Sequence, residues 1–182
     1  MELEITGINI PDTARNRIYK YLDKEVPLMD EDEIKYIESY LTPNTLMLEY
    51  GSGGSTFYFA NKVKRLVSVE SDIMWYMIAK LKIINKELHN IELLYCPNAK
   101  ADMYKTYSLI PDVAGYRNYD VILIDGKSAS RLTCIETCKK YMSVNTIIFW
   151  HDFTKHKKYV LPEYLELIKI VNSMAVVRLK LG

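Results

Sequence analysis

The apolar residues of the chain gather in short continuous runs that do not alternate with polar residues. Runs of this kind, rich in branched side chains, are typical of strands covered on both faces, as in a parallel sheet. We therefore predict five strands, over Thr45–Tyr50, Arg65–Glu70, Ile91–Cys96, Tyr119–Asp125 and Thr146–Asp152.

Helix-compatible stretches separate most of these runs, over Ser55–Asn61, Asp72–Glu87 and Ser130–Tyr141. A further helix is predicted to begin at Asp30, with acids in its first turn where the helix dipole favours them, and to end before Pro43. The longer connection from Pro97 to Asn118 is expected to hold a short helix near Ala101–Tyr107 and a loop. This alternation predicts a doubly wound α/β fold.

The two ends of the chain are predicted separately. We expect a helix turn over Leu161–Glu166, then a hairpin in which two β-rich runs flank Asn172-Ser173, which gives a seven-stranded sheet with one antiparallel strand. Residues 1–29 are interrupted by Pro11 and Pro27 and are interpreted as an N-terminal arm with a short helix around Ala14–Tyr21. Residues 30–182 form the core of a single domain.

The composition agrees with one globular domain. The chain has 182 residues, of which 49% are hydrophobic and 26% charged, so it can bury a sizeable core and does not resemble a disordered chain. Its 24 lysines and arginines nearly balance 23 acids, for a net charge of +1. Because this balance supplies no field that attracts polyanions, a nucleic-acid partner is disfavoured.

Cysteine use and hydropathy indicate a cytoplasmic, soluble protein. Three cysteines without a C-x-x-C pair favour neither a disulfide framework nor a zinc knuckle. Glu2 and Glu4 carry the wrong charge for a signal peptide, and no apolar run approaches the roughly 18–20 residues of a membrane span. The oligomeric state stays open, with a homo-oligomer among the expected states.

Four of the five predicted strands carry an acid at their carboxyl end, where ligands bind in open α/β sheets. Glu49 precedes a glycine-rich turn, Gly51–Gly54, that allows a ligand to approach backbone N–H groups. Glu70 lies 21 residues after Glu49, at a spacing suited to accepting hydrogen bonds from ribose hydroxyls. Asp125 and Asp152 end the fourth and fifth strands.

The glycine-rich turn departs from the dinucleotide pattern, because Thr56 replaces its third glycine and Glu49 places a carboxylate two residues before the first. Such an acid suits an amine-bearing or cationic ligand better than a pyrophosphate. Together, E-Y-G-S-G-G-S-T (Glu49–Thr56), V-I-L-I-D-G (Val121–Gly126) and I-I-F-W-H-D-F (Ile147–Phe153) resemble the class I S-adenosylmethionine-dependent methyltransferases. The resemblance covers Leu46–Phe153 and implies a Rossmann-like fold.

The resemblance also implies a cofactor site. Glu49, Gly51 and Gly53 would surround the methionyl end of S-adenosylmethionine, Glu70 would hold the ribose, and Ser71 with Cys96–Ala99 would border the adenine. An acid expected after the third strand is replaced by Pro97-Asn98-Ala99. The cofactor-binding residues expected in all are Glu49, Gly51, Ser52, Gly53, Ser55, Thr56, Glu70, Ser71, Asn98 and Asp125.

The expected chemistry is methyl transfer to a hydroxyl oxygen, which is a poor nucleophile without a base or a metal. We expect His151 to act as the base beside Asp125 and Asp152, and these two acids to hold an optional Mg²⁺ or Mn²⁺. The alternative interpretation of Asp125 is an N-cap of the following helix. We expect Asp125, His151 and Asp152 to converge in one pocket next to Gly51–Gly53.

The sequence alone does not identify the acceptor. The H-D motif resemblance favours a sugar or glycan hydroxyl, a small phenolic metabolite is the alternative, and a cofactor-binding or scaffold module without turnover is a third interpretation. A nucleic-acid methyltransferase is disfavoured because the chain lacks an Asn-Pro-Pro-Tyr-like motif.

Overall fold

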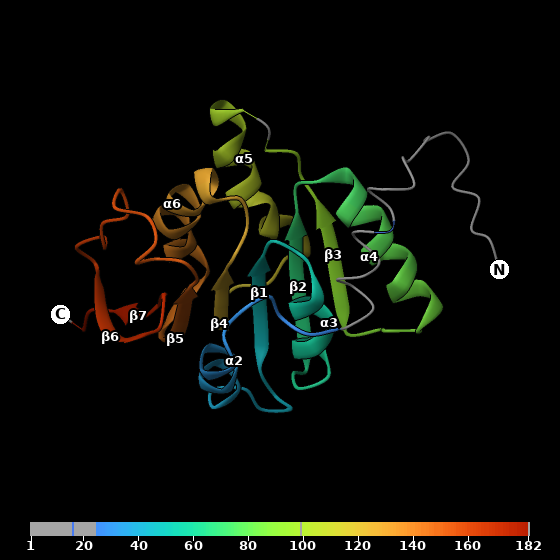
Figure 1. Ribbon diagram of the computed structural model, residues 1–182, viewed down its shortest axis with the longest axis horizontal. Helices are drawn as coiled ribbons and strands as arrows, with labels where there is room; N and C mark the ends of the chain where they lie inside the picture. The colour runs from blue at the N-terminus through green and yellow to red at the C-terminus, as the bar shows by residue number, and fades with distance from the viewer. Residues whose placement is uncertain (1–15, 17–24, 99, 182) are drawn as a thin grey trace.

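A computed structural model describes residues 16, 25–98 and 100–181 of the chain. The predicted arm helix, Ala14–Tyr21, lies outside these residues except for Asn16. The described part forms one seven-stranded sheet with helices on both faces (Figure 1). The predicted doubly wound α/β class is therefore confirmed.

The sheet has the strand order β3-β2-β1-β4-β5-β7-β6. Strands β1 to β5 are mutually parallel, and β7 runs antiparallel to both β5 and β6. Because the chain moves outward from β1 in one direction to β3 and then returns to place β4 on the other side of β1, the topological switch point lies between β1 and β4. The strands are β1 (Leu46–Tyr50), β2 (Arg65–Glu70), β3 (Ile91–Tyr95), β4 (Tyr119–Ile124), β5 (Met142–Trp150), β6 (Leu165–Val171) and β7 (Met174–Leu179).

The helices bury the two faces of the sheet in separate cores. Helices α2 (Glu31–Glu38), α3 (Gly54–Ala60) and α4 (Ile73–Asn85) contribute to one core, and α5 (Tyr104–Leu109) and α6 (Ser128–Thr137) contribute to the other (Figure 1). Successive strand residues alternate between these cores, as Met47 and Leu48 do on β1. This double coverage explains why the strand sequences are continuous apolar runs.

Three segments differ from the sequence-based expectation. The helix turn predicted over Leu161–Glu166 is wrong, because β6 begins at Leu165, which is buried and pairs with Leu179. Strand β5 begins at Met142, before the predicted Thr146, and pairs with Tyr119 through an irregularity in the β4 register. Ordered turns fill more of the 97–118 connection than predicted, namely η1 (Ala101–Met103), α5 and η2 (Ile110–Ala114).

The C-terminal hairpin is confirmed, and Asn172 adopts the left-handed conformation with φ of 49° that its tight turn uses. A 3₁₀ turn, η3 (Cys138–Tyr141), completes the helix predicted up to Tyr141. None of the helices in the described part of the chain has the length and hydrophobicity needed to cross a membrane.

Candidate functional site

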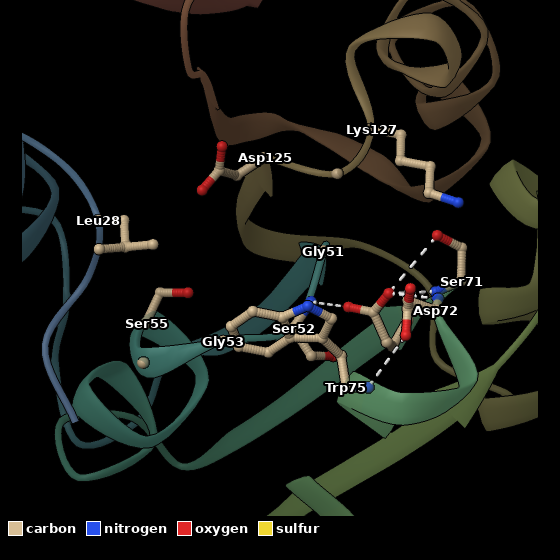
Figure 2. A pocket seen from close by; sticks show the side chains of 13 residues that line it. Leu28, Gly51, Ser52, Gly53, Ser55, Ser71, Asp72, Trp75, Asp125 and Lys127 are labelled. Carbon is tan, nitrogen blue, oxygen red and sulfur yellow. Dashed lines mark hydrogen bonds between the residues drawn. The ribbon is translucent and has the colours of Figure 1, made fainter. Parts of the chain in front are cut away.

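A cleft of about 320 Å³ opens at the carboxyl ends of β1, β2 and β4, the edge at which the switch point predicts a ligand site. Seven of the expected site residues line it, namely Gly51, Ser52, Gly53, Ser55, Glu70, Ser71 and Asp125. Five others do not line it: Glu49, Thr56, Asn98, His151 and Asp152. In Figure 2, Leu28 and Asp125 stand at one end of the cleft, and Ser71, Asp72 and Trp75 stand at the other.

The floor of the cleft is the turn after β1, where Gly51 has φ of +97°. A side chain at Gly51 would bring its Cβ to 2.7 Å from the Cα of Gly126, in the turn after β4. The residue must therefore be glycine both for its backbone conformation and for the close approach of the two turns.

Glu70, at the end of β2, anchors that turn. Its Oε2 accepts a hydrogen bond of 2.9 Å from the backbone N–H of Ser52, and its Oε1 accepts bonds of 2.6 Å from the N–H groups of Ser71 and Asp72. Burial raises the pKa of Glu70 above its ordinary value, although these N–H groups oppose the shift. Because Oε2 accepts only one of these bonds, it can accept a further one from a ligand hydroxyl.

Glu49 lies beneath the turn and is fully buried. Its carboxylate accepts hydrogen bonds from the hydroxyls of Ser55 at 2.5 Å, Thr56 at 2.6 Å and Ser68 at 2.6 Å. Burial raises the pKa of Glu49 to about 7 despite these three bonds. Glu49 and Thr56 thus act from below, by fixing the start of α3 against β1 and β2.

Asn98 is also buried and lies outside the cleft lining. Its Nδ2 donates a hydrogen bond of 3.0 Å to Ser130 Oγ on α6, whereas its Oδ1 has no hydrogen-bond partner among the described residues. Asn98 therefore ties the end of β3 to α6.

At the opposite end of the cleft, Asp125 is the only member of the predicted triad that lines the cavity. His151 is 6% exposed, and both of its ring nitrogens face carboxylates: Nδ1 lies 2.7 Å from Asp125 Oδ1, and Nε2 lies 3.3 Å from Glu33 Oε2. Burial favours the neutral ring, but Asp125, Asp152 and Glu33 together raise the pKa of His151. His151 contacts Asp125, which lines the cleft, but does not line the cleft itself. The N-cap position of α6 belongs to Lys127, which makes no side-chain cap hydrogen bond, and not to Asp125.

Asp152 lies beside this pair with a left-handed backbone, at φ of 55°. Its Oδ1 lies 2.7 Å from Lys155 Nζ and its Oδ2 lies 3.1 Å from Arg131 Nη1. Partial burial opposes ionisation, but Lys155, His151 and Arg131 hold the pKa of Asp152 below its ordinary value. The ligand atoms of Asp125, His151 and Asp152 all lie within 4.8 Å of one another, but the three residues do not converge in the cleft as expected, because His151 and Asp152 do not line it. Arg131 already stands between the two carboxylates. The donor set therefore does not fit a divalent cation.

Several residues of the site are not predicted by any motif in the sequence. Glu33 was interpreted as an acid that favours the helix N-terminus, but it is 1% exposed and its Oε1 accepts bonds from Ser173 N and Oγ at 3.0 Å each. Arg131 and Leu28 belong to no motif. Gly54 lies in one, but its role is to make room: a Cβ there would lie 2.2 Å from the carbonyl oxygen of Val26.

Comparison with known proteins gives a shared fold. No protein-family model matches the sequence, and no curated protein matches it. A methyltransferase-like protein from Silicibacter pomeroyi superposes with a TM-score of 0.70 at 22% identity, covering 85% of this chain and 88% of that one. The fold is therefore that of structures described as methyltransferases.

Two further structures extend this likeness at lower identity. A Streptococcus mutans protein assigned as a methyltransferase, in complex with SAH (S-adenosylhomocysteine), has a TM-score of 0.56 and 12% identity, covering 84% of this chain and 100% of that one. A Staphylococcus aureus protein assigned as a caffeoyl-CoA O-methyltransferase has a TM-score of 0.60 and 13% identity, with 94% and 93% covered.

Proposed function

We propose that the protein is an S-adenosylmethionine-dependent O-methyltransferase. The observation that carries the proposal is the placement of two carboxylates in one cleft: Glu70 at the end of β2 and Asp125 at the end of β4, on either side of the Gly51 turn. The shared fold of structures described as methyltransferases, one of them in complex with SAH, supports it.

The end of the cleft near Glu70 suits the nucleoside part of the cofactor. Glu70 Oε2 has capacity for a ribose hydroxyl, the Ser71 hydroxyl lies beside it, and the Trp75 side chain lines the same end (Figure 2). Glu49 and Thr56 then contribute by holding the turn in place, and Asn98 contributes by holding α6. S-Adenosylmethionine, when bound, supplies a methyl group on a positively charged sulfur.

The end near Asp125 suits the acceptor. Asp125 Oδ1 is held by His151 and by Arg131, whereas its Oδ2 makes no hydrogen bond with any described residue. Oδ2 is therefore the oxygen that accepts the proton of the acceptor hydroxyl as that oxygen becomes nucleophilic. His151 donates to Oδ1 from behind and positions the carboxylate. This assignment gives the base role to Asp125 and a positioning role to His151.

A sugar or glycan hydroxyl is the first acceptor we propose, because a carboxylate oxygen is a good partner for a vicinal hydroxyl pair. A small phenolic acceptor is the second, and one observation favours it. Leu28 is 64% exposed and stands opposite Asp125 at the same end of the cleft, so it offers an apolar wall to a flat ring (Figure 2).

Incubation with methyl-labelled cofactor and a panel of free sugars, oligosaccharides, phenols and RNA tests the proposal. We expect label in a sugar or a phenol and none in RNA, with transfer lost in Asp125→Asn and retained in Asp102→Asn, which changes an exposed carboxylate that does not line the cleft. Label in RNA alone would contradict the acceptor class. No transfer despite cofactor binding would favour the scaffold interpretation.

A further inference from the structure

The guanidinium of Arg131 on α6 binds the carboxyl ends of two strands at once. Its Nε donates to the carbonyl oxygen of Gly126 at 2.6 Å, and its Nη1 donates to the carbonyl oxygen of His151 at 2.6 Å. The same group reaches both acids, with Nη2 at 2.9 Å from Asp125 Oδ1 and Nη1 at 3.1 Å from Asp152 Oδ2. Its side chain is only 8% exposed, so these bonds are made in a largely water-free setting.

These two carboxylate oxygens belong to the atoms that a divalent ion would need. Asp125, His151 and Asp152 form the group of potential metal ligands at this edge of the sheet. Hard cations such as Mg²⁺ and Mn²⁺ select carboxylate oxygens, and here Arg131 occupies an oxygen of each acid, while Lys155 occupies the second oxygen of Asp152. An arriving ion would have to displace a rigid fork that makes several bonds at once.

The charges around Asp125 and Asp152 also disfavour a divalent ion. Arg131 pairs with both Asp125 and Asp152, and Lys155 pairs with Asp152 as well. A divalent ion would add two positive charges where each of these carboxylates already has a cationic partner. Burial makes such an imbalance costly.

We propose that Arg131 is the resident cation of this site: it takes the place of a divalent metal between Asp125 and Asp152, excludes such ions and fixes Asp125 toward the cleft. The exclusion rests on the contacts alone, whereas the positioning of Asp125 for proton transfer rests on the proposed function. Arg131 is thus a positioning residue, and its removal should turn the acid pair into a metal site.

Binding of Mn²⁺, followed through the loss of the free-ion electron paramagnetic resonance signal, tests this inference without any acceptor. The full chain is compared with Arg131→Met, which keeps the apolar stem but not the charge, and with Arg131→Lys, which keeps a cation. Arg117→Met is the matched control, because Arg117 is 48% exposed and pairs with Asp112 outside the cluster. Thermal unfolding with and without Mn²⁺ confirms that each variant is folded.

We expect no specific Mn²⁺ site in the wild type, in Arg131→Lys or in Arg117→Met. Arg131→Met should bind one ion per chain, at least about tenfold more tightly than the wild type, and lose it when Asp152→Asn is added. A wild-type site that disappears in Asp152→Asn would overturn the inference, even if Arg131→Met does not fold. A folded Arg131→Met that binds no ion would also overturn it. Neither outcome depends on methyl transfer, so the proposed function is tested separately.

Discussion

His151 Nδ1 lies 2.7 Å from Asp125 Oδ1, and the buried imidazole therefore stands behind the carboxylate that faces the cleft. The expected arrangement, in which His151 contacts the acceptor and Asp125 lies beside it, is therefore reversed. Under the proposed function, Asp125 contacts the acceptor and His151 holds Asp125 in place. The relationship gives the two residues different expected phenotypes.

Asp125→Asn should lower kcat by roughly 10²-fold or more, because the acceptor hydroxyl loses its general base. His151→Gln keeps a hydrogen bond to Asp125 and should lower kcat less. Steady-state kinetics with the acceptor identified from the panel, together with SAH affinity for each variant, separates the two effects. A His151→Gln loss equal to that of Asp125→Asn would return the base role to His151.

Glu33→Gln should lower the pKa of His151, because it removes the carboxylate 3.3 Å from Nε2. Because the pKa of His151 is raised in the folded state, its protonation stabilises the fold. This contribution is fully present below the pKa of the unfolded state, about 6.5, and is lost as the pH rises through the pKa of the folded state. Glu33→Gln should therefore lose more stability below about pH 6.5 than well above the folded-state pKa of His151. An NMR titration of the His151 ring provides the direct measurement, and an unchanged midpoint would show that Glu33 does not stabilise the imidazolium.

Glu49→Gln should flatten the pH dependence of stability in the acidic range. Burial raises the pKa of Glu49 from 4.5 to about 7, so the folded state holds this proton more tightly than the unfolded state. Stability should fall as the pH rises between these values, by about 3 kcal/mol in all at roughly 1.4 kcal/mol per pH unit.

Urea unfolding at several pH values measures this effect. Glu136→Gln, which removes an exposed carboxylate on α6, is the control and should keep the wild-type slope. A Glu49→Gln profile as steep as that of the wild type would assign the pH dependence to other groups.

Gly54→Ala should destabilise the protein by about 1–3 kcal/mol, because the new Cβ would lie 2.2 Å from the Val26 carbonyl oxygen and force the 25–29 segment away. Gly53→Ala is a control in the same motif. Its Cβ would meet nothing nearer than Ser55 Oγ at 4.0 Å, and its φ of −173° is extended backbone open to any residue. Equal unfolding midpoints for the two variants would contradict this packing role.

The strands, and the strand carboxyl ends that meet at the cleft, could be predicted from the sequence because both follow from local patterns. Buried parallel strands are continuous apolar runs, and their carboxyl ends share one edge, so Gly51, Glu70 and Asp125 were placed correctly. The direction in which His151 points could not be predicted, since a residue at a strand end can face either side of the sheet.

Glu33 and Arg131, which contact His151 and the acids beside it, also could not be predicted from the sequence. Glu33 accepts hydrogen bonds from Ser173, 140 residues away. Its position three residues after Asp30 is a local signal for the start of α2, where its Oε2 accepts a bond from the Asp30 N–H, but not for the contact with Ser173. Arg131 is one basic residue among 24 lysines and arginines, and only tertiary contacts with the ends of β4 and β5 single it out. Likewise, β6 forms where pairing with β7 overrides the local preference of Leu161–Glu166.

Isothermal titration of the full chain with SAH tests whether the cleft binds this cofactor. We expect one SAH per chain, no comparable binding of NAD, and a loss of about 1–3 kcal/mol in Glu70→Ala because a buried hydrogen-bond partner of the ribose is removed. Glu166→Ala, which changes a surface carboxylate on β6, should bind SAH as the wild type does. Equal affinity for NAD, or SAH binding that is unaffected by Glu70→Ala, would contradict the account.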